Sequence, residues 1–162
     1  MSCSYLLIIF CPNLEIVRVT NCSIPSSEGI WEIINGCSST LRDLDITLRD
    51  LDITLLENVS NIFGSGDLEQ FTMPNLTVLN ASKTGINDEV MAMIGKRCPH
   101  LQLLNISCCQ RVTNKGVKEV VRNCKKLRGI VLFGCKNVST DIVSWMVVSR
   151  PSLKNIVLPN HS

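Results

Sequence analysis

The residues with the greatest chemical reactivity in this 162-residue chain are nine cysteines and two histidines. A structural zinc site would need Cys-x-x-Cys pairs or cysteines and histidines at regular short spacing, and neither pattern occurs. The adjacent pair Cys108-Cys109 could be redox-active. However, Cys109 occupies a position that recurs along the chain, which favours packing as a small apolar side chain. His100 and His161 form no recognisable catalytic set with a serine or cysteine.

Four carboxylates, at Asp43, Asp45, Asp50 and Asp52, lie close together in the sequence and could bind a metal ion. They belong to a duplicated heptad, in which residues 41–47 reappear unchanged as residues 48–54. Solvated side chains on a surface strand are therefore the better interpretation. No glycine-rich phosphate loop follows a predicted strand. The sequence predicts no enzyme activity, no cofactor and no metal.

Composition limits the classes of partner. A net charge of +2 argues against nucleic acid, which needs a clustered basic stripe, although Lys125, Lys126 and Arg128 form a small basic group. The apolar run at residues 5–10 is too short to span a membrane and lacks the layout of a signal peptide. The odd cysteine number favours a reduced protein. We expect a cytoplasmic or nuclear location and no membrane association.

The elements that position these residues follow from an internal repeat. The pattern Leu-x-x-Leu-x-Leu recurs at intervals of 27, 35, 25, 26 and 26 residues. Its first leucines are Leu14, Leu41, Leu76, Leu101, Leu127 and Leu153. Removing one copy of the duplicated heptad reduces the interval of 35 to 28. A fixed period in this range indicates stacked supersecondary units.

Each unit combines a short strand with a helix. Helix caps are predicted at Ser26 or Ser27, at Asn87, at Thr113 or Asn114, and at Ser139 or Thr140. The predicted inward-facing helix residues are Ile30, Ile33 and Ile34; Val90, Met93 and Ile94; Val117, Val120 and Val121; and Val143, Met146 and Val147. Seven cysteines, at positions 11, 22, 37, 98, 109, 124 and 135, occupy repeated slots and should form buried ladders.

The sequence thus predicts one domain, an α/β solenoid over residues 1–162 with about five to six repeats. The expected divisions are a partial repeat at 1–10, repeats at 11–36, 37–72, 73–97, 98–123 and 124–149, and a terminal strand and tail at 150–162. Because a solenoid end exposes its core unless it is capped, the opening residues are also consistent with a piece of a longer array.

The duplicated heptad allows two interpretations. Either one copy forms the strand and the other is displaced into the next loop, or residues 41–55 form a helix with leucines at heptad spacing. The threonines Thr47 and Thr54 favour the strand, because threonine is a poor helix former. Which copy forms the strand stays open. A helix is expected at residues 55–63 and a loop at 64–67.

These units resemble the cysteine-containing leucine-rich repeats that are best known from F-box proteins, the substrate receptors of cullin-type ubiquitin ligases, and from relatives of the antagonist of mitotic exit network. The resemblance implies a solenoid with a curved parallel sheet on the concave side and helices on the convex side. It also implies recognition of a protein substrate. The F-box, which binds the Skp-type adaptor, is not seen in this chain, so adaptor binding is expected only if an F-box lies upstream.

The residues between the leucines should line the concave face. The candidate protein-binding residues are Arg18, Asp43, Asp45, Val78, Asn80, Leu103, Asn105, Val131, Phe133 and Val157. The series changes from charged to apolar along the stack, and Phe133 is the expected aromatic anchor. An exposed apolar patch usually marks a contact site. The alternatives are that a neighbouring domain or the C-terminal tail covers these residues, that the chain is a free-standing scaffold or sequestering protein, or that it is a secreted receptor-type domain.

Overall fold

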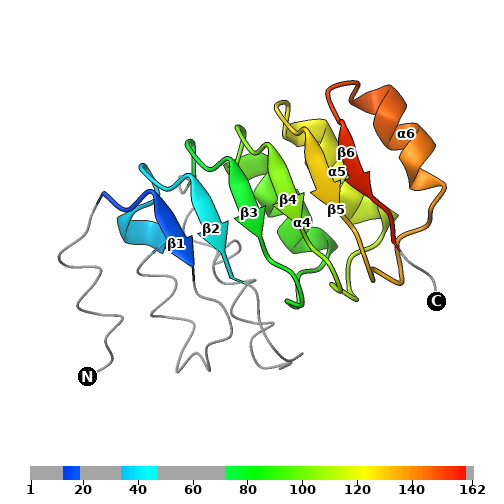
Figure 1. Cartoon of the computed structure of the whole chain (residues 1–162), viewed down its shortest axis with the longest axis horizontal. Coiled ribbons are helices and arrows are strands. Elements are labelled where there is room, and N and C mark those ends of the chain that lie inside the picture. Colours follow the sequence, from blue (N-terminus) through cyan, green and yellow to red (C-terminus); the bar gives the residue numbers. More distant parts are fainter. Residues whose placement is uncertain (1–12, 19–33, 47–71, 160–162) are drawn as a thin grey trace.

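The computed structural model describes residues 13–18, 34–46 and 72–159. Within them, six strands form a single parallel sheet in sequence order (Figure 1). The strands are β1 (Ile16–Arg18), β2 (Asp43–Asp45), β3 (Val78–Asn80), β4 (Leu103–Asn105), β5 (Gly129–Val131) and β6 (Asn155–Val157). Every neighbouring pair is parallel, and helices lie behind the sheet in Figure 1. The predicted α/β leucine-rich-repeat solenoid is confirmed.

The strands are in register at the repeated leucines. Leu44 pairs with Leu79, which pairs with Leu104 and then Ile130. These middle strand residues are at most 1% exposed. The first leucines of the pattern, from Leu41 to Leu127, are also fully buried. Because side chains alternate along a strand, burying the middle residue directs the first and third residues to the opposite side.

In the part of the chain that the structure describes, three complete helices cover the other side of the sheet: α4 (Asp88–Arg97), α5 (Asn114–Asn123) and α6 (Ile142–Ser149). The predicted cap at Asn87 is confirmed, because its side chain accepts a hydrogen bond from the Val90 backbone. Thr113 caps α5, and its hydroxyl accepts from the backbone N–H of Lys115 at 3.2 Å. Val90, Ile94 and the three predicted valines of α5 are buried, and Met93 is half-buried.

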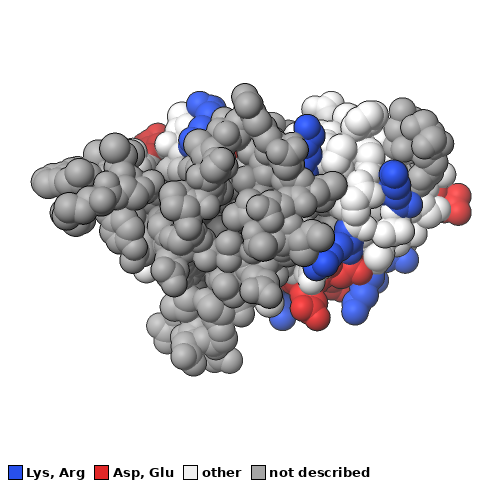
Figure 2. Space-filling model, turned by 90° about the horizontal axis from the view of Figure 1, so that it is seen from below, with Lys and Arg blue, Asp and Glu red and all other residues white. Residues whose placement is uncertain are grey.

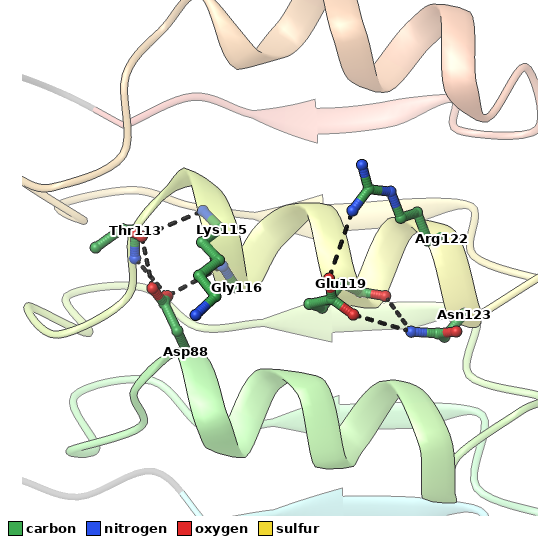
Figure 3. Close-up of polar contacts among 7 residues, drawn as sticks. All are labelled: Asp88, Thr113, Lys115, Gly116, Glu119, Arg122 and Asn123. Carbon is green, nitrogen blue, oxygen red and sulfur yellow. Dashed lines mark hydrogen bonds and ion pairs between the residues drawn. The ribbon is translucent and has the colours of Figure 1, made fainter.

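One carboxylate joins two neighbouring helices (Figure 3). Asp88, at the start of α4, accepts hydrogen bonds from the backbone and the hydroxyl of Thr113, at 2.8 and 2.6 Å. It also accepts one from the Gly116 backbone at 3.1 Å. Free N–H groups at a helix start attract negative charge, so Asp88 stabilises the N-terminus of α5 from the preceding unit. A Cβ at Gly116 would collide with this carboxylate, which explains the glycine inside a helix.

The cysteine ladder is confirmed for the described slots. Cys37, Cys98, Cys109, Cys124 and Cys135 are all buried. Three of these thiols donate to a carbonyl of the preceding unit: Cys109 to Ala81 at 3.3 Å, Cys124 to Cys98 at 3.5 Å and Cys135 to Ile106 at 3.1 Å. Burial raises the pKa of Cys109 and of Cys124 to about 12 from the ordinary 9.0. These side chains pack as neutral thiols and are poor nucleophiles.

The last unit departs from the expected pattern. Val147 was expected to face inward but is 49% exposed, while Ile142 is buried with Met146. Helix α6 begins at Ile142, after the predicted cap, and Ser139 accepts from the backbone of Asp141 instead. Apolar residues surround this helix on almost all sides, so the sequence marks no single inward face. Leu158, the last leucine of the pattern that begins at Leu153, is 44% exposed, and no described unit follows β6 to cover it.

The first copy of the duplicated heptad supplies β2, and its Leu44 lies in the core. The second copy at 48–54, the helix expected at 55–63 and the loop expected at 64–67 lie outside the described residues. The same holds for the partial repeat at 1–10, for Cys11 and Cys22, for the cap at Ser26 or Ser27, and for Ile30 and Ile33.

Candidate functional site

The open face is the side of the sheet formed by the first and third residues of the strands, opposite the helices. All ten candidate residues lie on or directly beside it. Arg18, Asp43, Asp45, Val78, Asn80, Leu103, Asn105, Val131 and Val157 are first or third strand residues. Phe133 lies two residues beyond the third residue of β5. The register of the sheet brings these residues together from positions far apart in the sequence.

The polar side chains of the open face begin at β1 and continue to Asn105 on β4, and we call this part the polar end. They form hydrogen bonds with neighbouring residues of the same chain. The Arg18 guanidinium donates to the Asp43 carboxylate at 2.7 Å. Asn80 donates to Asp45 at 3.2 Å. Asn105 accepts from both the backbone and the hydroxyl of Ser107, at 3.0 and 2.6 Å. A partner that bound here would have to replace these internal contacts.

The apolar patch consists of Leu103, Val131, Phe133 and Val157. Leu103, Phe133 and Val157 are 43%, 48% and 45% exposed, and Val131 is half-buried. An apolar side chain gains about 25 cal/mol for each Å² removed from water, so a partner that covered these residues would bind favourably.

The backbone around Phe133 is fixed on both sides. The Phe133 carbonyl accepts from the Cys108 backbone at 2.7 Å, and the Leu132 N–H donates to the Val157 carbonyl at 2.9 Å. Gly134 follows with a φ of +71°, which glycine adopts without strain. The aromatic ring is therefore presented from a rigid turn, which lowers the entropy cost of using it as an anchor.

Gly129 explains how Leu103 reaches across the sheet. A Cβ at Gly129 would lie 2.7 Å from Cδ2 of Leu103, so the leucine occupies the space that a side chain would fill. Gly129 is consequently buried although it is a first strand residue. Although Gly129 is one of the residues between the leucines, it leaves room for the Leu103 side chain.

The sequence prediction missed the residue that precedes each strand, which we call the entry position. These residues are Glu15, Arg42, Thr77, Gln102, Arg128 and Lys154. From Arg42 onwards, each backbone N–H in this row donates to the carbonyl of the previous member at 2.8 Å. The Leu-x-x-Leu pattern contains two outward positions between its leucines. The entry position is the first of them, and the predicted binding residues include only the second. Ile16, 53% exposed, also faces outward at the polar end.

Among residues 13–18, 34–46 and 72–159, no three His, Cys, Asp or Glu side chains are grouped closely enough to hold a metal ion. None of the described helices is long and apolar enough to cross a lipid bilayer. Cys108, with a φ of +60°, is half-buried beside Gly134.

Comparisons with known proteins agree with this geometry. Residues 97–121 match the family model described as Leucine Rich repeat. The chain is 22% identical over 159 residues to F-box/LRR-repeat protein 4 of Bos taurus, covering 97% of this chain and 24% of that protein. The chain thus spans about a quarter of the relative's length.

A solved structure has the same architecture. The tropomodulin C-terminal domain of Caenorhabditis elegans superposes with a TM-score of 0.53 over 99% of this chain and 85% of that one, at 12% identity. This likeness concerns the fold alone. Together with the register of six parallel strands and the buried leucine and cysteine ladders, the comparisons identify the chain as a leucine-rich-repeat solenoid similar in sequence to an F-box/LRR-repeat protein.

Proposed function

We propose that this chain recognises a protein partner through the open face and that Phe133 is the main anchor. The observation that carries the proposal is the apolar patch, whose side chains are exposed although the interior of the solenoid is closely packed. Exposed apolar patches mark contact sites, and rigid aromatic side chains are frequent binding hot spots. Loss of the Phe133 ring should therefore affect binding more than loss of any polar residue on the same face.

The partner that we propose is a substrate of a cullin-type ubiquitin ligase, recognised in the cytoplasm or nucleus. The support is the sequence similarity to F-box/LRR-repeat protein 4, which extends over 97% of this chain. In this proposal the repeats hold the substrate, and an F-box elsewhere in a longer protein contacts the Skp-type adaptor. The repeats alone should then bind the substrate without the adaptor.

The first experiment compares Phe133→Asp with Val148→Asp. Val148 is 81% exposed on α6, away from the open face, so it is a matched apolar-to-acidic control. Proteins captured by the wild-type chain are identified by mass spectrometry, and the affinity of each is measured for both variants. We expect Phe133→Asp to weaken the affinity for the partner that binds the open face about 30-fold or more, which corresponds to the loss of a hot-spot residue. Equal binding by both variants would exclude the open face as the site.

The second experiment tests the ligase link. The full-length protein that contains this chain is expressed with a tag, and co-purification of a Skp-type adaptor is measured. The partner should accumulate in cells that carry Phe133→Asp and should be ubiquitinated in cells with the wild-type protein. A full-length protein that binds the partner but never the adaptor would favour the sequestering scaffold.

A further inference from the structure

Charge is distributed very unequally between the two parts of the chain. Residues 1–97 contain six Lys and Arg against twelve Asp and Glu, a net charge of −6. Residues 98–162 contain ten Lys and Arg against two carboxylates, a net charge of +8. The small overall charge of +2 conceals this asymmetry. The units of β4, β5 and β6, which carry the apolar patch, are therefore strongly basic.

The two carboxylates of this basic part belong to the helix layer. Glu119 lies on α5, where it forms an ion pair with Arg122 at 3.4 Å and contacts Asn123 (Figure 3). Asp141 immediately precedes α6. Among the described residues, the open face of the last three units consequently has no acidic side chain. Figure 2, which views the molecule from below, shows Lys and Arg together with Asp and Glu on the described part of that side.

The entry row shows the difference most clearly. In the first two units this row pairs Arg42 with Glu15, whose charged atoms lie 3.8 Å apart. In the last two units the same row carries Arg128 and Lys154, which are both exposed and directly precede neighbouring strands. Neither forms an ion pair with a described carboxylate. Like charges at adjacent strand positions are destabilising, so an external anion would relieve a repulsion that the fold itself leaves in place.

The cationic pair borders the apolar patch. Arg128 directly precedes Gly129, over which Leu103 lies, and Lys154 precedes β6, whose third residue is Val157. An apolar side chain and a carboxylate that are close together in one partner could therefore bind at the same time. Nucleic acid fits less well, since it needs an extended basic groove with several aromatic stacking residues, and this face has two cations beside aliphatic side chains.

We infer that the partner of the open face is an acidic protein segment, in which Asp or Glu residues flank an apolar side chain. Apolar side chains of the segment contact Phe133, Val131 and Leu103, and its carboxylates contact Arg128 and Lys154. This inference rests on the proposed function and specifies the chemistry of its partner. Such complementarity mainly increases the association rate and the specificity, and it weakens as salt screens the charges.

The test is selection of a random peptide library displayed on phage against the purified chain, with counter-selection against Phe133→Asp. We expect the enriched peptides to carry a net negative charge around one or two apolar residues. Enrichment of neutral or basic peptides would overturn the inference, as would a lack of any enrichment. A single-stranded oligonucleotide and phosphatidylserine vesicles are tested in parallel, and tighter binding of either would also overturn it.

Charge variants then separate the inference from the proposed function. The double variant Arg128→Glu/Lys154→Glu should bind the selected peptide about tenfold more weakly at low salt, because two surface ion pairs are lost. The control, Lys96→Glu with Lys115→Glu, makes the same change in net charge on the exposed surface of α4 and α5 and should have little effect. Thermal unfolding confirms that both variants fold.

The natural partner gives the decisive result. If its binding is lost in Phe133→Asp but is the same in Arg128→Glu/Lys154→Glu as in the control, the acidic-segment inference is wrong and the proposed function stands. If its binding is unaffected by Phe133→Asp, the proposed function fails as well. If both variants weaken it, and added salt reduces wild-type affinity, both are supported.

Discussion

The units of β1 and β2 and the units of β4 to β6 share one interior but have different open faces. In both regions the middle strand residue faces the core, although Ile156 of β6 is only half-buried, and from Arg42 onwards the entry-position N–H donates to the preceding unit at 2.8 Å. On the open face of the first region, Arg18 pairs with Asp43. The second region exposes Phe133 and also Arg128 and Lys154, which form no ion pair with a described carboxylate. The repeat therefore determines the solenoid, whereas the outward positions are free to differ and can specialise for binding.

The largest effect should come from breaking what the two regions share. Leu104→Ala removes a side chain that is 1% exposed in the middle of the sheet and should cost about 2–5 kcal/mol of unfolding free energy. The adjacent Leu103→Ala, at a residue 43% exposed, should cost less than about 1 kcal/mol. Urea denaturation measures both. Similar costs would contradict the alternation of buried and open residues.

Alkaline pH should distinguish the two regions through the cysteine ladder. Burial raises the pKa of Cys109 and Cys124 in the folded state, so only the unfolded state loses these protons just above pH 9. The contribution of these thiols to the free energy of unfolding is fully present below pH 9 and decreases as the pH rises towards 12. At pH 10 the loss should be about 1 kcal/mol for each thiol.

The measurement is thermal or urea unfolding between pH 8 and pH 10. Cys109→Ala combined with Cys124→Ala should have a smaller dependence on pH than the wild-type chain. Hydrogen exchange should accelerate more at β4 and β5 than at β2, whose unit has Cys37 as its one described cysteine. An unchanged pH dependence in the double variant would show that other groups cause the loss.

An intermediate effect should come from the junction between units. Asp88→Ala removes a carboxylate that accepts three hydrogen bonds from the start of α5 and should cost about 1–3 kcal/mol. Asn114 is at the corresponding position of the next unit and accepts one bond, from the Ser139 backbone at 2.9 Å. Asn114→Ala should therefore cost about 1 kcal/mol or less. Urea unfolding that ranked these variants in the opposite order would contradict the capping role of Asp88.

The smallest effect should come from the ion pairs of the polar end. Arg18 and Asp43 are 59% and 24% exposed, so solvent screens their attraction, and Asp43→Asn should cost less than about 1 kcal/mol. The cost should shrink further at high salt. Binding by the apolar patch should be unchanged in this variant. A large loss of affinity would show that the polar end also contacts the partner.

Much of the fold followed from periodicity alone. The recurring Leu-x-x-Leu-x-Leu pattern located the core positions of β2 to β5, and polar residues at Asn87 and at Thr113 or Asn114 indicated two helix starts. These are local signals, because alternation along a strand and capping of a helix depend on residues close in sequence. Where the local signal was absent, as on α6 with apolar residues all round, Val147 was assigned to the wrong side.

The sequence by itself determined the repeating unit, the buried ladders and the outward direction of the candidate residues. The tertiary structure alone decided which residues of different units meet: Asp88 with the start of α5, Leu103 over Gly129, and Arg128 beside Lys154. Such pairs are separated by about one repeat, so no short-range pattern marks them. Their contacts depend on how the units stack in register, and that stacking places an apolar patch beside two unpaired cations.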